Sequence, residues 1–193
     1  QIYAVRFVGS VGYVVTFRQT DPLFALDLAD PAHPRVTGEL TMPGYSAYLH
    51  PLGGNLLLGI GRDASTDGIT SGVLVSLFDV ADPARPRLLD RVPLPGTWAG
   101  VESDAHAFTY ADGLALVPVE SGVLAVPVRD RALGTPSVLR LTSGSAADGG
   151  VDAGRMRVFA DADRLWTVAP AAGGALLAVH DVGDLSLQTS LRF

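Results

Sequence analysis

The sequence predicts an all-β fold, a β-propeller of four consecutive four-stranded antiparallel blades. The first observation behind this prediction is that DLADPAHPR, at residues 27–35, returns almost unchanged as DVADPARPR at residues 79–87. The second is that the Asp closing this strand-and-turn phrase recurs after 52, 48 and 54 residues, at Asp30, Asp82, Asp130 and Asp184. A repeat of about 50 residues built from short β-like segments is typical of propeller blades.

Each repeat holds four segments rich in Val, Leu, Phe and Tyr, separated by Gly, Pro, Asp and Asn. They are 2–8, 12–17, 23–28 and 35–40; 46–50, 55–60, 73–80 and 87–94; 105–110, 114–119, 123–128 and 137–141; 155–160, 165–169, 175–182 and 186–193. We expect one propeller domain, or part of one, with blades at approximately 1–43, 44–96, 97–142 and 150–193. Two Gly/Ser/Asp-rich loops, 61–72 and 142–154, interrupt the pattern.

The repeated phrase marks a turn between the third and fourth strands of a blade. Asp is favoured in such turns because its carboxylate accepts backbone N–H groups, and the following Pro supplies a φ near −65°. The second Pro, Pro34 or Pro86, opens a strand and cannot donate to a ladder. It therefore suits the outer edge strand of the blade.

Composition excludes several classes of protein. Of the 193 residues, 48% are hydrophobic, so the chain can bury a sizeable core, and the net charge of −6 argues against a nucleic-acid partner. No apolar run is long enough to span a membrane. The absence of Cys excludes disulfides. The basic residues are all Arg, which is typical of a GC-rich bacterial genome.

Residues 2 to about 130, from YAVRFVGSVGYVVTFRQTDPLFALDLADPAHPRVTGEL through PGYSAYLHPLGGNLLLGIGRD, resemble secreted bacterial proteins with a C-terminal β-propeller domain, which are distantly WD-repeat-like. LFALDLADPAHPRVTGEL also resembles the related propeller repeat named for its Leu-Val-Ile-Val-Asp core. The resemblance implies a secreted or cell-envelope protein, and it carries over no catalytic residue. Members of that family have more blades than this chain supplies.

Polar residues on the first segments of the blades are the candidate binding site, because first strands line the channel of a propeller. His50 and His106 lie on such segments, with Arg6 and Arg157 at comparable places. Asp104 lies two residues before His106, which on a strand puts both on one face. A carboxylate beside an imidazole can orient it for binding or proton transfer. The candidates are completed by the nearby Glu102 and by Trp98, an aromatic residue that could stack on a sugar or peptide.

Two further histidines are expected to have surface or structural roles, and one acidic loop is a weak candidate for binding calcium. His33 lies in the repeated turn, where the second blade has Arg85, and is expected on the surface. His180 is expected to be structural. Asp63 and Asp67 suggest a weak calcium loop, although the ligand order of an EF-hand is not met.

The leading functional prediction is a non-enzymatic recognition scaffold, secreted or envelope-associated, that binds a protein, peptide or glycan. The alternatives are a hydrolase or lyase with a polar site in the channel, and a calcium-stabilised structural domain. No cofactor other than calcium is expected. Four blades without a spare strand favour an incomplete ring, finished by further blades or by a homodimer.

Overall fold

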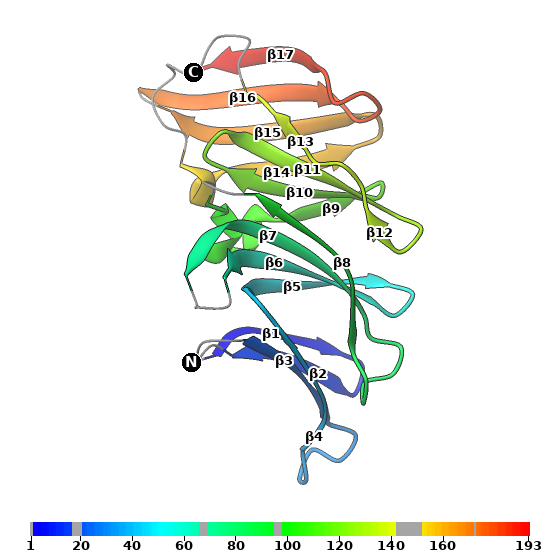
Figure 1. The fold of residues 1–193 in the computed structure, drawn as a ribbon. Helices are drawn as coiled ribbons and strands as arrows, with labels where there is room; N and C mark the ends of the chain where they lie inside the picture. Colours follow the sequence, from blue (N-terminus) through cyan, green and yellow to red (C-terminus); the bar gives the residue numbers. More distant parts are fainter. Residues whose placement is uncertain (1, 17–20, 66–68, 95–97, 142–151, 172) are drawn as a thin grey trace. The chain divides into compact units, whose positions relative to one another are not determined.

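The computed structural model describes residues 2–16, 21–65, 69–94, 98–141, 152–171 and 173–193, and it consists of antiparallel β-sheets (Figure 1). The predicted all-β fold of successive antiparallel sheets is confirmed, with four strands in three of the sheets and five in the sheet formed by residues 109–139. The chain divides into two compact units, of which unit 1 holds residues 1–96 and 130–133, and unit 2 holds residues 97–129 and 134–193.

Unit 1 contains two sheets whose strands pair in chain order (Figure 1). Sheet 1 consists of β1 (Ile2–Val8), β2 (Val11–Thr16), β3 (Asp21–Asp27) and β4 (Arg35–Met42). Sheet 2 consists of β5 (Tyr45–Gly53), β6 (Leu56–Ala64), β7 (Thr70–Asp79) and β8 (Arg87–Leu94). The two-residue strand β12 (Ala132–Leu133) also belongs to this unit.

Unit 2 contains sheets 3 and 4 and three short 3₁₀ helices. Sheet 3 includes β9 (Thr109–Ala111), β10 (Leu114–Val119), β11 (Gly122–Arg129) and β13 (Ser137–Leu139). Sheet 4 consists of β14 (Arg157–Asp161), β15 (Arg164–Ala171), β16 (Gly174–Asp181) and β17 (Leu187–Arg192). The helices are η1 (Gly100–Glu102), η2 (Ala105–Ala107) and η3 (Ala153–Arg155). Within the described ranges, none of the helices is long and apolar enough to cross a bilayer.

Two sequence predictions are corrected in detail. The expected loop at 61–72 is shorter, because β6 continues to Ala64 and β7 begins at Thr70. The expected strand at 105–110 begins as helix η2, and only its end enters β9. Most of the predicted loop 142–154 lies outside the described residues.

Each unit has a core formed between the facing sides of its two sheets. In unit 1 the core is made by one face of sheet 1 and by sheet 2, and includes Tyr13, Ala25, Leu57, Leu74 and Phe78. In unit 2 it is made by sheets 3 and 4 and includes Leu116, Ala125, Met156, Leu165 and Ala178. Along their strands these residues alternate with residues of the opposite face, as β periodicity requires, and in β7 and β10 that opposite face is buried as well.

The repeated turn is built as the sequence predicts, with one Asp carboxylate capping each of its two bends. Asp27 and Asp30 accept the N–H groups of Ala29 and Ala32 at 3.0 Å. The same distances recur in sheet 2 from Asp79 to Ala81 and from Asp82 to Ala84. Sheet 4 keeps both caps without the prolines, from Asp181 to Gly183 at 2.7 Å and from Asp184 to Ser186 at 2.9 Å. The carboxylates therefore form the turn in each of these sheets.

A register shift follows this turn in three sheets and creates an equivalent position on the outer strand. Gly38 pairs with Ala25, Asp90 with Leu77, and Thr189 with Val179, and each register shifts at the next pair. At Gly38 the turn of sheet 2 lies against the backbone, because a Cβ there would come within 2.1 Å of the Pro83 carbonyl oxygen. The bulge and the missing side chain together let the turn of sheet 2 seat on sheet 1.

We expect Gly38→Ala to destabilise the protein by roughly 1–3 kcal/mol, because a Cβ that meets backbone cannot be accommodated without moving the turn. The free energy of unfolding in urea measures the effect. Glu39→Ala, at the exposed neighbouring position, is the matched control and should change stability by less than about 0.5 kcal/mol. Equal stability of Gly38→Ala and the control would show that the turn is not seated there.

Candidate functional site

The innermost strands of unit 1 carry a group of polar and aromatic side chains. Arg6 on β1 donates from Nε to the carbonyl oxygen of Leu49 on β5 at 2.8 Å. Its guanidinium lies 5.2 Å from the ring centroid of Tyr48, and the Tyr48 hydroxyl is 3.2 Å from Nδ1 of His50. Burial, followed by the nearby Arg6 charge, lowers the pKa of His50 below its ordinary value. His50 is therefore held in its neutral form near pH 7.

The Arg6 contact has a counterpart in unit 2 that explains its role. Thr109 on β9 donates to the carbonyl oxygen of Val158 on β14 at 2.6 Å. Arg6 and Thr109 occupy equivalent positions, since the cross-strand rows Arg6–Tyr13–Ala25 and Thr109–Leu116–Ala125 correspond. In both units a first-strand side chain bonds the backbone of the next first strand. Arg6 thus acts in joining two sheets.

A second polar cluster lies in unit 2, at the entrance to β14. Asp104 caps helix η2 by accepting the N–H of His106 at 2.9 Å, and the same carboxylate oxygen lies 2.9 Å from Nδ1 of the imidazole. Its other oxygen accepts from Nη2 of Arg157. The backbone N–H and then the imidazole of His106, with Arg157, lower the pKa of Asp104 below its ordinary value. Asp104 is therefore a carboxylate anion that holds both neighbours.

Trp98 joins the same cluster through Gly154. The Cη2 atom of the indole lies 3.5 Å from the position that a Cβ on Gly154 would take. The carbonyl oxygen of Gly154 accepts from Nη1 of Arg157 at 3.1 Å. Glu102 lies in helix η1 beside Trp98, where its carboxylate accepts the N–H of Ala99 at 3.2 Å. We call the set Trp98, Asp104, His106, Gly154 and Arg157 the η2 cluster.

The cluster differs from the predicted arrangement in a specific way. Asp104 and His106 were expected to share one face of a strand, whereas they share a helical cap, and the first-strand position equivalent to His50 is held by Thr109. Arg157 opens β14 two residues before Phe159, which is the equivalent residue in sheet 4. Arg6 and His50 belong to unit 1, whereas the η2 cluster belongs to unit 2. Gly154 and Thr109 were missed, because Thr109 bonds a residue 49 positions away and Gly154 acts through a close backbone approach. Tyr48 was interpreted as a packing residue, because its contact with Arg6 spans 42 residues.

Exposure decides which members of the η2 cluster are available to a ligand. The His106 side chain is 88% exposed, whereas those of Asp104 and Arg157 are about one-third exposed. Arg157 already donates to Asp104, to Gly154 and to the carbonyl of Met156. Because the Asp104 carboxylate is an acceptor, the His106 imidazole donates to it from Nδ1 and directs Nε2 away from that carboxylate. The cluster therefore offers an exposed imidazole, and its indole is half-buried.

The predicted calcium loop is engaged in another contact. The carboxylate of Asp63 pairs with the Arg91 guanidinium and lies 3.5 Å from the Ser71 hydroxyl, while Asp67 lies outside the described residues. Among the residues that the structure describes, no three His, Cys, Asp or Glu side chains are grouped to hold a metal. Calcium binding at this loop stays a prediction.

The remaining two histidines have contrasting surroundings. His33 is 78% exposed, with its Nδ1 2.8 Å from Asp30 in the repeated turn. His180 is buried at the position that Phe78 occupies in sheet 2, and its Nε2 lies 2.9 Å from the Arg140 carbonyl oxygen. Its Nδ1 is buried without a hydrogen-bond partner, and burial lowers the pKa of the imidazole. His180 is a neutral core residue.

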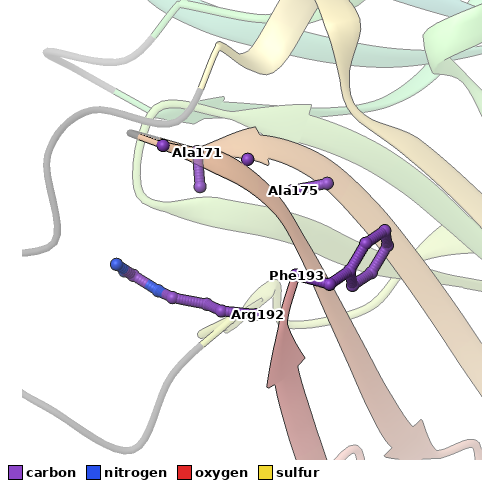
Figure 2. Close-up of a pocket in the computed structure, with 6 residues that line it drawn as sticks. Ala171, Ala175, Arg192 and Phe193 are labelled. Atoms are coloured by element: carbon purple, nitrogen blue, oxygen red, sulfur yellow. The ribbon is translucent and has the colours of Figure 1, made fainter.

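Two hollows lie on sheet 4. The smaller, of about 250 Å³, lies at the end of the sheet and is lined by Ala171, Gly173, Gly174, Ala175, Arg192 and Phe193 (Figure 2). The larger, of about 640 Å³, covers one face of the sheet and includes Trp166, Val179, Asp181, Thr189 and Leu191. Neither includes a residue of the η2 cluster.

His180 predicts a specific pH dependence of stability. A His whose pKa is lowered by folding binds protons more readily when unfolded, so the stability it permits is complete above about pH 6.5. That stability is lost as the pH falls from there toward the folded-state pKa. We expect His180→Phe to lose less stability than the parent between pH 7.5 and pH 5, measured by urea unfolding at each pH. His50 contributes in the same direction in both proteins, so parallel curves would contradict the assignment.

The Asp104–Arg157 ion pair predicts a measurable coupling. A double-mutant cycle with Asp104→Ala and Arg157→Ala should give a larger coupling energy of unfolding than the same cycle at Asp27 and Arg35. The reference pair is 3.5 Å apart and its Arg side chain is 74% exposed, so it should couple weakly. Equal coupling in the two cycles would mean that the η2 cluster is not held by this pair.

Comparison with known proteins identifies a family whose sequence pattern this chain matches, and two relatives. The sequence pattern of a family described as "Beta propeller domain" matches residues 1–160. Uncharacterized protein MJ1554 of Methanocaldococcus jannaschii is 46% identical over 110 residues, covering 57% of this chain and 17% of that protein. An uncharacterized protein of Archaeoglobus fulgidus is 41% identical over 142 residues, covering 63% of this chain and 22% of its own length. The chain thus spans about a fifth of the curated relatives it matches.

Solved structures agree on the fold. Apo AztD from Citrobacter koseri gives a TM-score of 0.56 at 13% identity, covering 99% of this chain and 46% of that one. The computationally designed Ika4 protein gives a TM-score of 0.55 at 11% identity, covering 95% of this chain and 92% of its own. At these identities the likeness concerns the fold alone. Both curated relatives are archaeal, so the expected resemblance to secreted bacterial proteins is not confirmed beyond the propeller itself.

Proposed function

This chain belongs to the beta propeller domain family, and we propose that it is a non-enzymatic recognition scaffold whose η2 cluster binds a neutral polar ligand, a glycan or a peptide segment. The observation that carries the proposal is the exposed His106 imidazole, fixed by Asp104 in a cluster that also contains the Trp98 indole. We further propose that it acts in a secreted or envelope setting.

The chemistry of the cluster favours a neutral ligand. The Arg157 charge is paired with Asp104, and its guanidinium makes two further hydrogen bonds within the protein, so this cation is already compensated. The outward Nε2 of His106 suits hydrogen bonding to a hydroxyl or an amide group, and an indole face suits the C–H face of a sugar or an apolar side chain. Both features occur together in glycans and in peptides.

The same contacts argue against Asp104 as the general base of the hydrolase or lyase alternative. A general base acts best with a pKa near the working pH. Asp104 has instead a lowered pKa and is bonded to the His106 N–H, the imidazole and Arg157. The carboxylate orients its neighbours, which is what a binding site requires.

The test compares His106→Ala and Trp98→Ala with a matched control. A glycan array and a phage-displayed random peptide library are the two probes, and binders from either are measured by calorimetry. We expect each substitution to weaken a selected binder about tenfold or more, the cost of about 1.4 kcal/mol of lost contact. His33→Ala removes the corresponding Asp–His pair of the turn in unit 1 and should leave affinity unchanged. Failure of both probes, or binders indifferent to both substitutions, would contradict the proposal.

A further inference from the structure

One contact recurs in unit 1 wherever a turn meets the outer strand of the preceding sheet. The turn of sheet 2 seats on Gly38, with the Pro83 carbonyl oxygen and the Ala84 carbonyl carbon 2.1 and 2.9 Å from where its Cβ would be. At the equivalent Asp90 the segment 130–133 also meets the outer strand, here through a side chain, because the Leu133 N–H donates to the Asp90 carboxylate at 2.9 Å. Arg131 of that segment also pairs with Asp79 at 2.9 Å. A neighbouring turn therefore packs against one equivalent position of the outer strand, and we call this position the receiver.

Sheet 4 has the equivalent receiver position, and there it is exposed to solvent. Thr189 is the equivalent of Gly38 and Asp90 by register, and Asp181 is the equivalent of Asp79 at the start of the turn. Both residues line the hollow of about 640 Å³ on sheet 4. Thr189 is exposed. The position that accepts a turn twice in unit 1 thus lies in a hollow large enough to take one.

An apolar row crosses that face of sheet 4, next to a charged row that contains Asp161, Arg164 and Asp181. Phe159, Trp166, Val179 and Thr189 form one cross-strand row, and Leu177 faces Leu191 in a nearby row. Phe159 is 56% exposed and Leu191 59% exposed. In sheet 1 the equivalent row contains Tyr13 and Ala25, which are buried in the core with sheet 2. The face of sheet 4 has the composition of a sheet-to-sheet interface.

Sheet 1 presents the complementary half. Its turn has the same two Asp caps as the turn of sheet 2, yet Pro31 and Pro34 are exposed, whereas Pro83 is half-buried and Pro86 is buried. The row Phe7–Gly12–Leu26–Val36 corresponds to a row in sheet 2 that contains Leu57 and Phe78. Those two are fully buried against sheet 1, but Phe7 is 66% and Val36 63% exposed.

We propose that the exposed face of sheet 4 docks sheet 1 of a second copy of this chain, with the Asp30–Pro34 turn of that copy seated at Thr189. A second copy is the occupant because one chain carries both halves of the contact and its pairing continues the interface already present between sheets 1 and 2. The association is head to tail, so the two surfaces are different and each copy retains one of each. This inference does not depend on the ligand of the η2 cluster.

A disulfide trap tests the contact directly, since the chain has no Cys. Ala84 lies beside Gly38, so the equivalent Ala32 should lie beside Thr189 of the second copy. We expect Ala32→Cys mixed with Thr189→Cys to give, under mild oxidation, a cross-linked species of twice the 20.1 kDa chain mass. Ala32→Cys mixed with Ser121→Cys, an exposed residue of the β10–β11 turn, should cross-link at least about tenfold more slowly.

Solution mass supplies the second readout. Sedimentation equilibrium of the parent chain should show self-association, and Thr189→Arg should weaken it about tenfold or more by filling the receiver. Ser121→Arg adds the same charge elsewhere and should leave it unchanged. A strict monomer, or cross-linking that is no faster at Thr189 than at Ser121, would overturn the proposal and assign this face to a different occupant, such as a further blade of a longer relative.

Discussion

The structure depends on one constraint: a four-stranded sheet with two apolar faces must bury both against neighbouring sheets. In unit 1 the side chains of Tyr13 and Ala25 meet Leu57 and Phe78 between the sheets. Hydrogen bonds across the same interfaces are few and specific. Arg6 reaches Leu49 in unit 1, and Thr109 reaches Val158 in unit 2, each fixing one first strand to the next. Apolar burial supplies the stability, and these bonds set how the sheets align.

The parts of the fold that could be predicted are those determined by residues that lie close together in the sequence. Period-two alternation and the Asp-Pro turn fall within about ten residues, and strands such as β1 and β10 have the bounds that their apolar runs predict. The prediction failed where a local cap competes with strand propensity. At Asp104 the carboxylate accepts the His106 N–H and starts a 3₁₀ turn, so residues 105–107 leave the strand that their apolar neighbours suggest. Strand β12 is two residues long and has no pattern to detect.

The candidate site shows the same division. That Asp104 and His106 would act together could be predicted from their spacing, although the geometry joining them is a helical cap rather than a strand face. That Arg157 would join them was predicted only as one of several residues converging on an axis. The contact arises because η2 and the start of β14 meet across 53 residues, which no short pattern reports. Gly154 was missed because a glycine's closeness to an indole leaves no periodic trace.

Polar groups that are bonded across an interface between sheets differ in role from those that are available to bind a ligand. Arg6, Thr109 and Asp90 each bond the backbone of a neighbouring segment, and His180 is buried against the Arg140 carbonyl. A polar group committed in this way cannot meet a ligand without weakening the packing of two sheets, because a buried partner would lose its hydrogen bond. His106 differs, since it is held from one side by Asp104 and its side chain is otherwise open to solvent. A side chain that is oriented but exposed loses little conformational entropy on binding and is accessible to a ligand. We therefore expect recognition at the η2 cluster rather than at the row of first-strand residues.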